Sequence, residues 1–154
     1  MKNVFTLILL LFATQSFGQN ASNNEIEIKK TINQLFEGMY KSDSTLLKNS
    51  FDKNAILQTI VKNKEGIVSV KNESTQEFIK SIGGKHPQYE EKIKFIDIKV
   101  DGELATVWTN YQFFVDNKFS HCGVNSFQMV KSNNSWKIAY IIDTRRKDNC
   151  PDIN

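Results

Sequence analysis

Apolar and polar residues alternate over three long segments in the last third of the chain, which predicts three consecutive antiparallel strands. The segments are residues 105–115, 119–130 and 136–146. Tight turns are predicted between them, at Asp116-Asn117 and at Ser132-Asn133-Asn134. Asn and Asp are typical of hairpin turns because they tolerate positive φ. The C-terminal third is therefore expected to form a strand meander.

The N-terminal part of the chain shows helical periodicity instead. A capping box at Ser22 to Glu25 precedes apolar residues on one helical face, namely Ile28, Ile32, Leu35, Phe36 and Met39. Gly38 inside this helix suggests a close approach to a neighbouring element. A short second segment carries Leu46, Leu47 and Phe51, and a third helix is capped by Ser74 and ends at Gly83-Gly84.

Three further strands are predicted between and after these helices. Residues 55–60 and 67–70 flank a polar turn, and residues 93–100 lead through an Asp101-Gly102 turn into the meander. In the last strand, strict alternation places Trp136 and Ile138 on the face toward the helices. It places Ala139 and Ile141 on the opposite, outer face, where an apolar surface suggests an interface.

The first eighteen residues have the pattern of a secretory signal peptide. Lys2 precedes an apolar run from Val4 to Ala13, and Ser16-Phe17-Gly18 supplies small residues before a cut at Gln19. The run is too short to span a bilayer, which needs about 20 residues. We therefore expect a domain of residues 19–154 that is exported to the periplasm or the medium without a membrane anchor; an uncleaved anchor is the alternative.

The charge and the cysteines narrow the choice of partners. The formal net charge is only +3, and no basic stripe is interleaved with aromatic residues, so nucleic acid is not an expected partner. No metal motif or cofactor motif is present in the sequence, so neither a metal nor a cofactor is expected. Cys122 and Cys150 form either a disulfide or two separate thiols.

The order helix, short helix, two strands, helix and four strands resembles the nuclear transport factor 2-like superfamily. Within it, the strongest likeness is to the SnoaL-like and "putative lumazine-binding" families, through His121-Cys122-Gly123, Trp136-Lys137-Ile138 and Asp143-Thr144-Arg145-Arg146. The resemblance implies an α+β cone, in which helices pack in the concave face of a strongly curved antiparallel sheet and a pocket lies between them. Superfamily members include ketosteroid isomerase, scytalone dehydratase and SnoaL-type polyketide cyclases, so fold alone does not assign an activity.

A few polar residues are candidates for such a pocket. His121 and Asn125 share one face of their strand, and a neutral imidazole there would serve as a base or a hydrogen-bond partner; a purely structural histidine is the alternative. Asp143 and Arg145 also share a face, as an ion pair that lowers the pKa of the carboxyl or as an anion-binding arginine.

Aromatic residues supply further candidates. Trp108, Tyr111 and Tyr140 are expected either in the core or in the pocket wall. The strand of residues 105–115 carries apolar residues at both odd and even positions, so the sequence does not decide which of its faces lines the pocket.

Three function classes follow. The preferred one is an exported domain that binds a small apolar or ring-containing molecule, with His121 and one tyrosine as orienting groups. The first alternative is an isomerase, dehydratase or cyclase with His121 as general base and Asp143 as its orienting partner. The second is a non-catalytic interaction module, and a homodimer through the outer sheet face is expected in any case.

Export gives the first testable expectation. Protein isolated from its native source should begin at Gln19, because the small residues at positions 16 and 18 define the cut. Intact-mass measurement checks this, and a mass that still includes residues 1–18 would contradict it.

Overall fold

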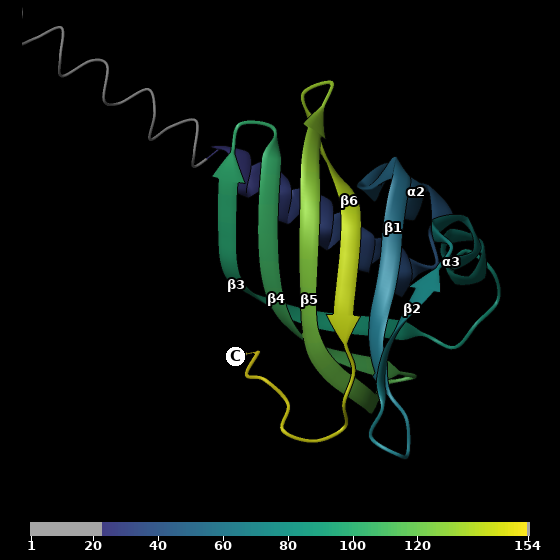
Figure 1. Cartoon of the computed structure of the whole chain (residues 1–154). Coiled ribbons are helices and arrows are strands. Elements are labelled where there is room, and N and C mark those ends of the chain that lie inside the picture. Colours follow the sequence, from purple (N-terminus) through teal and green to yellow (C-terminus); the bar gives the residue numbers. More distant parts are fainter. Residues whose placement is uncertain (1–22, 154) are drawn as a thin grey trace, which may run out of the picture.

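A six-stranded sheet curves around one long helix in the computed structural model, which describes residues 23–153 (Figure 1). The chain runs through a first helix (residues 23–41), α2 (Ser44–Ser50), β1 (Phe51–Lys62), β2 (Val68–Glu73), α3 (Thr75–Ile82), β3 (Tyr89–Asp101), β4 (Leu104–Val115), β5 (Lys118–Ser132) and β6 (Ser135–Thr144). The expected signal peptide and the capping Ser22 lie outside the described residues.

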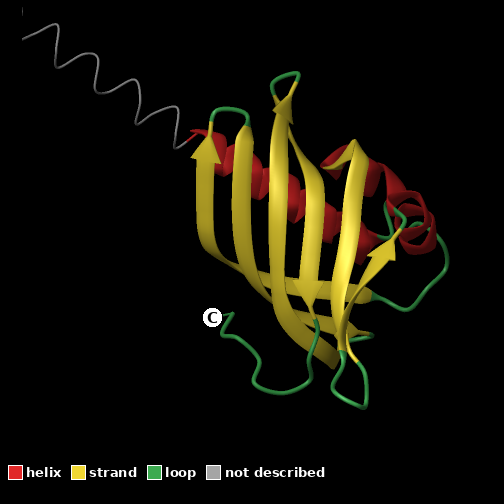
Figure 2. Ribbon diagram, viewed as in Figure 1, coloured by secondary structure: helices red, strands yellow, loops and turns green. Residues whose placement is uncertain are grey.

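The strands are ordered β2-β1-β6-β5-β4-β3, and the helices lie on one side of the sheet (Figure 2). The predicted α+β cone with helices in the concave face of a curved sheet is confirmed. One pair departs from the antiparallel pattern, because β1 runs parallel to β6. This pairing joins the first strand to the last, so no hairpin constrains its direction.

The predicted turns are confirmed by the backbone. Asp116 and Asn117 have φ values of 48° and 62°, and Asn133 and Asn134 have 51° and 59°. Two successive residues with positive φ give a hairpin turn whose twist matches that of the strands. The meander of β4, β5 and β6 therefore depends on side chains that tolerate this conformation.

Two strands begin earlier than the sequence indicated. Phe51 was assigned to the short helix but is the first residue of β1, and its φ and ψ of −92° and 150° are extended. Its ring packs edge-on against Phe78 of α3, with centroids 6.1 Å apart. β3 begins at Tyr89 rather than at Ile93, because its first four residues pair with the end of β4.

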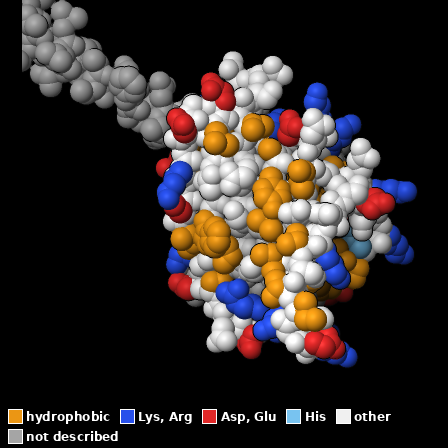
Figure 3. All heavy atoms as spheres, viewed as in Figure 1, with side chains coloured by type: hydrophobic (Ala, Val, Ile, Leu, Met, Phe, Trp, Pro, Cys, Tyr) orange, Lys and Arg blue, Asp and Glu red, His pale blue; other side chains and the backbone are white. Residues whose placement is uncertain are grey.

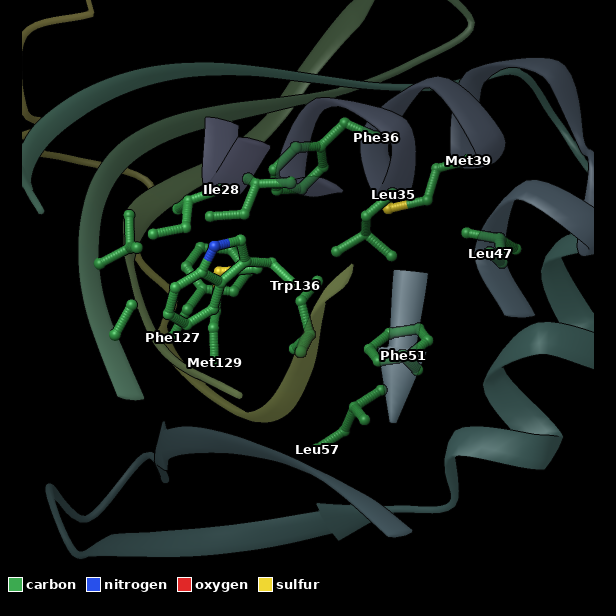
Figure 4. Packing of buried hydrophobic residues seen from close by; sticks show 14 of the residues in the cluster. Ile28, Leu35, Phe36, Met39, Leu47, Phe51, Leu57, Phe127, Met129 and Trp136 are labelled. Atoms are coloured by element: carbon green, nitrogen blue, oxygen red, sulfur yellow. The ribbon is translucent and has the colours of Figure 1, made fainter. Parts of the chain in front are cut away.

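The core lies between the first helix and the concave face of the sheet. Trp136 and Ile138 are 2% and 0% exposed, which confirms their predicted burial. Figure 4 shows the Trp136 ring near Phe127 in this core, and the Phe127 ring meets Phe36 of the first helix edge-on at 6.4 Å. The apolar helical face predicted from the sequence is thus the face that packs on the sheet.

Gly38 marks a close helix contact, as predicted. A Cβ atom at this position would lie 3.1 Å from the side chains of Leu46 and Leu47. That spacing is tighter than ordinary van der Waals contact. The absence of a side chain at Gly38 therefore lets α2 pack directly on the first helix.

One extra residue interrupts the pairing of β5 with β6. Met129 pairs with Ile138 and Gln128 pairs with Tyr140, so Ala139 has no partner on β5. Two residues on one strand then oppose one on the other, which is a β-bulge. A bulge bends its strand and shifts the alternation of side chains by one position.

The bulge reverses the faces of the second half of β6. Trp136 and Ile138 point toward the helices before it, and Ile141 and Asp143 do so after it. The expectation that Ala139 and Ile141 both lie on the outer face is therefore wrong for Ile141, which packs against the core. Uninterrupted alternation was the assumption that failed.

The segment after β6 folds back onto β5. Cys122 and Cys150 form a disulfide with a Cα–Cα distance of 5.6 Å. The backbone of Cys122 also exchanges two hydrogen bonds with Arg146, at 2.8 and 2.9 Å. A Cβ atom at Gly123 would lie 1.8 Å from the carbonyl oxygen of Thr144, so only glycine allows the two strands to approach this closely.

The outer face of the sheet carries exposed apolar side chains. Ile56, Leu104 and Trp108 are 54%, 51% and 46% exposed, and each neighbours an inward-facing residue on its strand. Hydrophobic side chains gather over the strands on the face shown in Figure 3. Trp108 therefore belongs to the outer surface.

The two tryptophans allow a matched stability test. Trp136→Ala should lower the free energy of unfolding by about 3–5 kcal/mol, because it removes a buried ring from the core. Trp108→Ala, on the outer face, should cost less than about 1 kcal/mol. Denaturant melts measure both. Equal losses for the two variants would contradict the assignment of the sheet faces.

Candidate functional site

A cavity of about 390 Å³ lies between the helices and the concave face of the sheet. Much of its wall is apolar and aromatic, with contributions from Leu35, Phe36, Met39, Phe51, Phe78 and Phe127. The remaining wall carries a polar cluster, which consists of Glu73, Glu91, His121, Asn125, Asp143 and Arg145. These polar groups come from β2, β3, β5, β6 and, for Arg145, the position just after β6, so the curvature of the sheet brings them together.

Asp143 lies in the centre of the polar cluster and is 8% exposed. Its Oδ2 accepts hydrogen bonds from Arg145 Nε at 2.8 Å and from the Tyr111 hydroxyl at 3.3 Å. Its Oδ1 is buried and has no hydrogen-bond partner among the described residues. One carboxylate oxygen is therefore held in place, while the other is left unsatisfied beside the cavity.

Tyr111 lies behind this carboxylate rather than in the cavity wall. Its hydroxyl also contacts the Thr144 carbonyl oxygen, at 2.8 Å. Burial, together with the negative charge of Asp143, raises the pKa of Tyr111 far above its ordinary value. The hydroxyl therefore stays protonated and donates to the Thr144 carbonyl oxygen and, at the longer distance, to Asp143 Oδ2.

Glu91 is the second carboxyl group of the cavity. Its Oε1 accepts a hydrogen bond from Asn125 Nδ2 at 2.8 Å, and Asn125 also reaches Thr109 Oγ1 at 3.4 Å. Burial raises the pKa of Glu91 to about 7, with a smaller contribution from the charge of Asp143, against the lowering effect of the Asn125 hydrogen bond. Glu91 is thus able to take up or release a proton near neutral pH.

His121 faces the cavity and is held between aromatic rings. Its ring centroid lies 4.9 Å from that of Phe113 and 5.7 Å from that of Tyr111. Burial, and then the positive charge of Arg145, lower the pKa of His121, so the imidazole is neutral at pH 7. Within residues 23–153, no hydrogen bond joins His121 to Asp143, so the suggested pairing of a histidine base with an orienting aspartate is not formed.

The structure separates the residues that the sequence suggested for the site. His121, Asn125, Asp143 and Arg145 line the cavity, and Tyr111 supports it through Asp143. Trp108 and Tyr140 do not line it. Trp108 is on the outer face because Val107 and Thr109 are the inward residues of β4.

Tyr140 is excluded from the cavity by the bulge at Ala139, which turns its side chain outward. Its hydroxyl donates a hydrogen bond to Gln58 Oε1 at 2.5 Å on the neighbouring strand β1. The expectation that Tyr140 and Trp108 bind a ligand in the cavity is therefore corrected.

Glu73, Glu91 and Thr59 were missed by the sequence analysis. In β3 the residues Tyr89, Glu91, Ile93 and Phe95 alternate with more polar positions, so an acidic residue stands in an otherwise apolar row. That signal was available, but the strand was expected to begin only at Ile93. Thr59 pairs with Asp143 across the parallel β1–β6 register, and its buried Oγ1 also lacks a partner among the described residues.

Within residues 23–153, no group of three or more His, Cys, Asp or Glu side chains is arranged to hold a metal ion. No helix within the described part of the chain combines the length and apolar character needed to cross a membrane.

Comparison with protein families gives one match. The family described as "Putative lumazine-binding" matches residues 23–140. No protein with a curated description matches the chain.

Solved structures of nuclear transport factor 2-like (NTF2-like) proteins share the fold. An NTF2-like protein of unknown function from Shewanella baltica superposes with a TM-score of 0.64 at 17% identity, over 82% of this chain and 97% of that one. An NTF2-like protein with a cystatin-like fold from Novosphingobium aromaticivorans superposes with a TM-score of 0.68 at 12% identity, over 87% of this chain and 89% of that one. A "putative dehydratase from the NTF2-like family" from Streptomyces avermitilis superposes with a TM-score of 0.63 at 10% identity, over 82% of this chain and 98% of that one. At these identities the likeness shows the fold alone.

The raised pKa of Glu91 is open to direct measurement. Its carboxyl carbon should titrate in NMR with a midpoint of about 7. Asp143→Asn should lower that midpoint, because it removes a negative charge that disfavours ionisation of Glu91. Glu103→Gln, in a surface turn, is the control and should leave the midpoint unchanged. A Glu91 midpoint near the ordinary glutamate value of 4.5 would show that burial does not act on this group.

Proposed function

We propose that this chain, which belongs to the "Putative lumazine-binding" family of the NTF2-like superfamily, binds a small ring-containing molecule in its cavity. The observation that carries the proposal is the set of unsatisfied polar atoms in the cavity wall. Asp143 Oδ1 and Thr59 Oγ1 are buried without partners among the described residues. A buried polar atom without a partner costs about 1–3 kcal/mol, which a ligand group would recover.

The size and lining of the cavity support the same proposal. Its volume of about 390 Å³ lies within the range of small-molecule sites, roughly 300–1,000 Å³. The rings of Phe36, Phe51, Phe113 and Phe127 form much of the apolar wall. Aromatic rings stack favourably with other rings, so a planar or ring-containing ligand suits this surface. A non-catalytic interaction module would be favoured by a cavity filled with its own aromatic side chains, and a cavity of this size gives that alternative less support.

Export is part of the proposal. The N-terminal pattern of residues 1–18 motivates it, and the Cys122–Cys150 disulfide supports it. Disulfides persist in the periplasm and outside cells, whereas reducing conditions in the cytosol remove them. The ligand would accordingly be met in an oxidising compartment.

A homodimer through the outer sheet face is a further element of the proposal. Ile56, Leu104 and Trp108 leave apolar surface exposed on that face. Burial of this apolar surface against a second copy of the chain would stabilise the dimer. Sedimentation of the protein at a concentration of tens of micromolar tests the dimer, because weak dimers have dissociation constants of roughly this order. A wild-type chain that sediments only as a monomer would count against the dimer.

Acid–base catalysis is the second candidate function, and Glu91 is the observation that favours it. A general base works best when its pKa lies near the operating pH, and the pKa of Glu91 is about 7. Catalysis would therefore depend on Glu91 rather than on His121. In that case Glu91→Gln should lower turnover by about 10²–10⁴-fold with the fold intact, while a pure binder would lose affinity only.

Binding is tested by NMR titration of the full-length protein with small ring compounds. Signals of cavity residues such as His121 and Asn125 should shift. Asn125→Ala should weaken a bound ligand by about 1–3 kcal/mol, because it releases the Glu91 carboxyl from its fixed position. Ser126→Ala, on the opposite face of β5, is the matched control and should leave affinity unchanged. If no ring compound moves the cavity signals at millimolar concentration, the proposed function is wrong.

A further inference from the structure

The polar cluster carries more acidic than basic groups. Glu73, Glu91 and Asp143 are carboxyl groups, and Arg145 is the one permanent cation among the residues that line the cavity. His121 adds no compensating charge at neutral pH, because its pKa is lowered by burial and by Arg145. With all three carboxyl groups ionised, this part of the wall would hold two negative charges that no cavity residue balances.

Two donor groups of the cluster are engaged within it. Arg145 Nε bonds Asp143 Oδ2, and Asn125 Nδ2 serves Glu91 and Thr109. By contrast, Asp143 Oδ1 is buried and has no donor among the described residues. An ionised carboxylate oxygen only accepts hydrogen bonds, so the group that completes this site must donate one.

We propose that the ligand carries a protonated nitrogen on an apolar ring, and that this nitrogen donates to Asp143 Oδ1 next to Glu91. The proposal rests on the proposed function and names its ligand class. A cationic nitrogen meets both needs of the site, since it supplies the missing donor and balances the surplus of carboxylates. The aromatic wall of the cavity then holds the ring.

An anionic ligand fits the same wall poorly. The Arg145 guanidinium is the group that would attract it, but Arg145 already pairs with Asp143 at 2.8 Å. An anion placed beside Arg145 would also face the charge of Asp143 and of Glu91. Like charges at such short range repel strongly in a partly buried site.

Binding of a cation should be coupled to the protonation of Glu91. The groups that act on Glu91 are Asn125 on β5, Asp143 on β6 and Arg145 just after β6. Glu73 on β2 and His121 on β5 also line the cavity, and Tyr111 on β4 is affected by the charge of Glu91. A bound cation favours the ionised carboxylate and so lowers the pKa of Glu91 from its value of about 7. Affinity for the cation therefore rises as the pH rises through about 7, and a proton is released on binding.

Three probes with the same phenyl ring separate these alternatives: 2-phenylethylamine, 2-phenylethanol and 3-phenylpropionate. Their dissociation constants are measured by NMR titration of the full-length protein about one pH unit below and above neutrality. The amine should bind at least about tenfold more tightly than the alcohol, and the carboxylate should bind most weakly. The preference for the amine should increase at the higher pH.

Two substitutions move the preference in opposite directions. Asp143→Asn should bring the affinity for the amine down to that for the alcohol, because it replaces the accepting carboxylate. Arg145→Gln should strengthen amine binding, because it removes the competing cation, whereas it would abolish binding if the ligand were an anion. Lys64→Gln, in the exposed turn after β1, makes the same change of net charge as Arg145→Gln but far from the cavity, and it should not alter the affinity for any of the probes.

The possible outcomes distinguish this inference from the function on which it rests. If the alcohol or the carboxylate binds as tightly as the amine, the ligand class is wrong although the cavity still binds small molecules. If none of the three probes shifts the cavity signals, both the proposed function and the ligand class are overturned. Should Asp143→Asn fail to fold, the opposite responses expected for Arg145→Gln still decide between a cation and an anion.

Discussion

The unpaired Ala139 in β6 determines what the cavity contains. Before it, β6 contributes Trp136 and Ile138 to the core; after it, the same side of the strand presents Ile141 and Asp143. Without the extra residue, alternation would direct Tyr140 inward and Asp143 toward solvent. The bulge also bends β6, and with the register irregularities of the β3–β4 and β4–β5 pairings it contributes to the curvature of the sheet around the helices. A single insertion therefore couples the shape of the cone to the placement of its central carboxylate.

That placement has electrostatic consequences across the sheet. Asp143 keeps Arg145 and Tyr111 in fixed positions, while its negative charge disfavours ionisation of Glu91 on β3. Two carboxyl groups thus share one cavity in different surroundings: Asp143 is paired with the Arg145 guanidinium, whereas Glu91 has a pKa of about 7. Such a pair suits both the selective binding of a ligand that donates a hydrogen bond and the exchange of a proton with that ligand. Binding and acid–base chemistry therefore depend on the same few groups, and only the bound molecule decides between them.

Local patterns in the sequence were sufficient for most of the fold. The Asn and Asp pairs at the hairpins, the apolar face of the first helix and the burial of Trp136 follow from turn chemistry and periodicity, which act over a few residues. The site was less predictable because it depends on register. A bulge leaves no local mark in the sequence around Ala139, so the faces of Tyr140, Ile141 and Asp143 could not be assigned by alternation. Glu91 became recognisable only when the pairing with β4 showed that β3 begins at Tyr89.

The most direct test is a crystal structure of the protein with 2-phenylethylamine bound. The account predicts the ring against the aromatic wall and the amine nitrogen within hydrogen-bond distance of Asp143 Oδ1, about 2.7–2.9 Å for a charge-assisted bond. It also predicts that Ala139 is unpaired and that Asp143 faces the cavity. A structure in which β6 alternates without interruption and Asp143 lies on the outer face would contradict the account, as would an amine bound only outside the cavity.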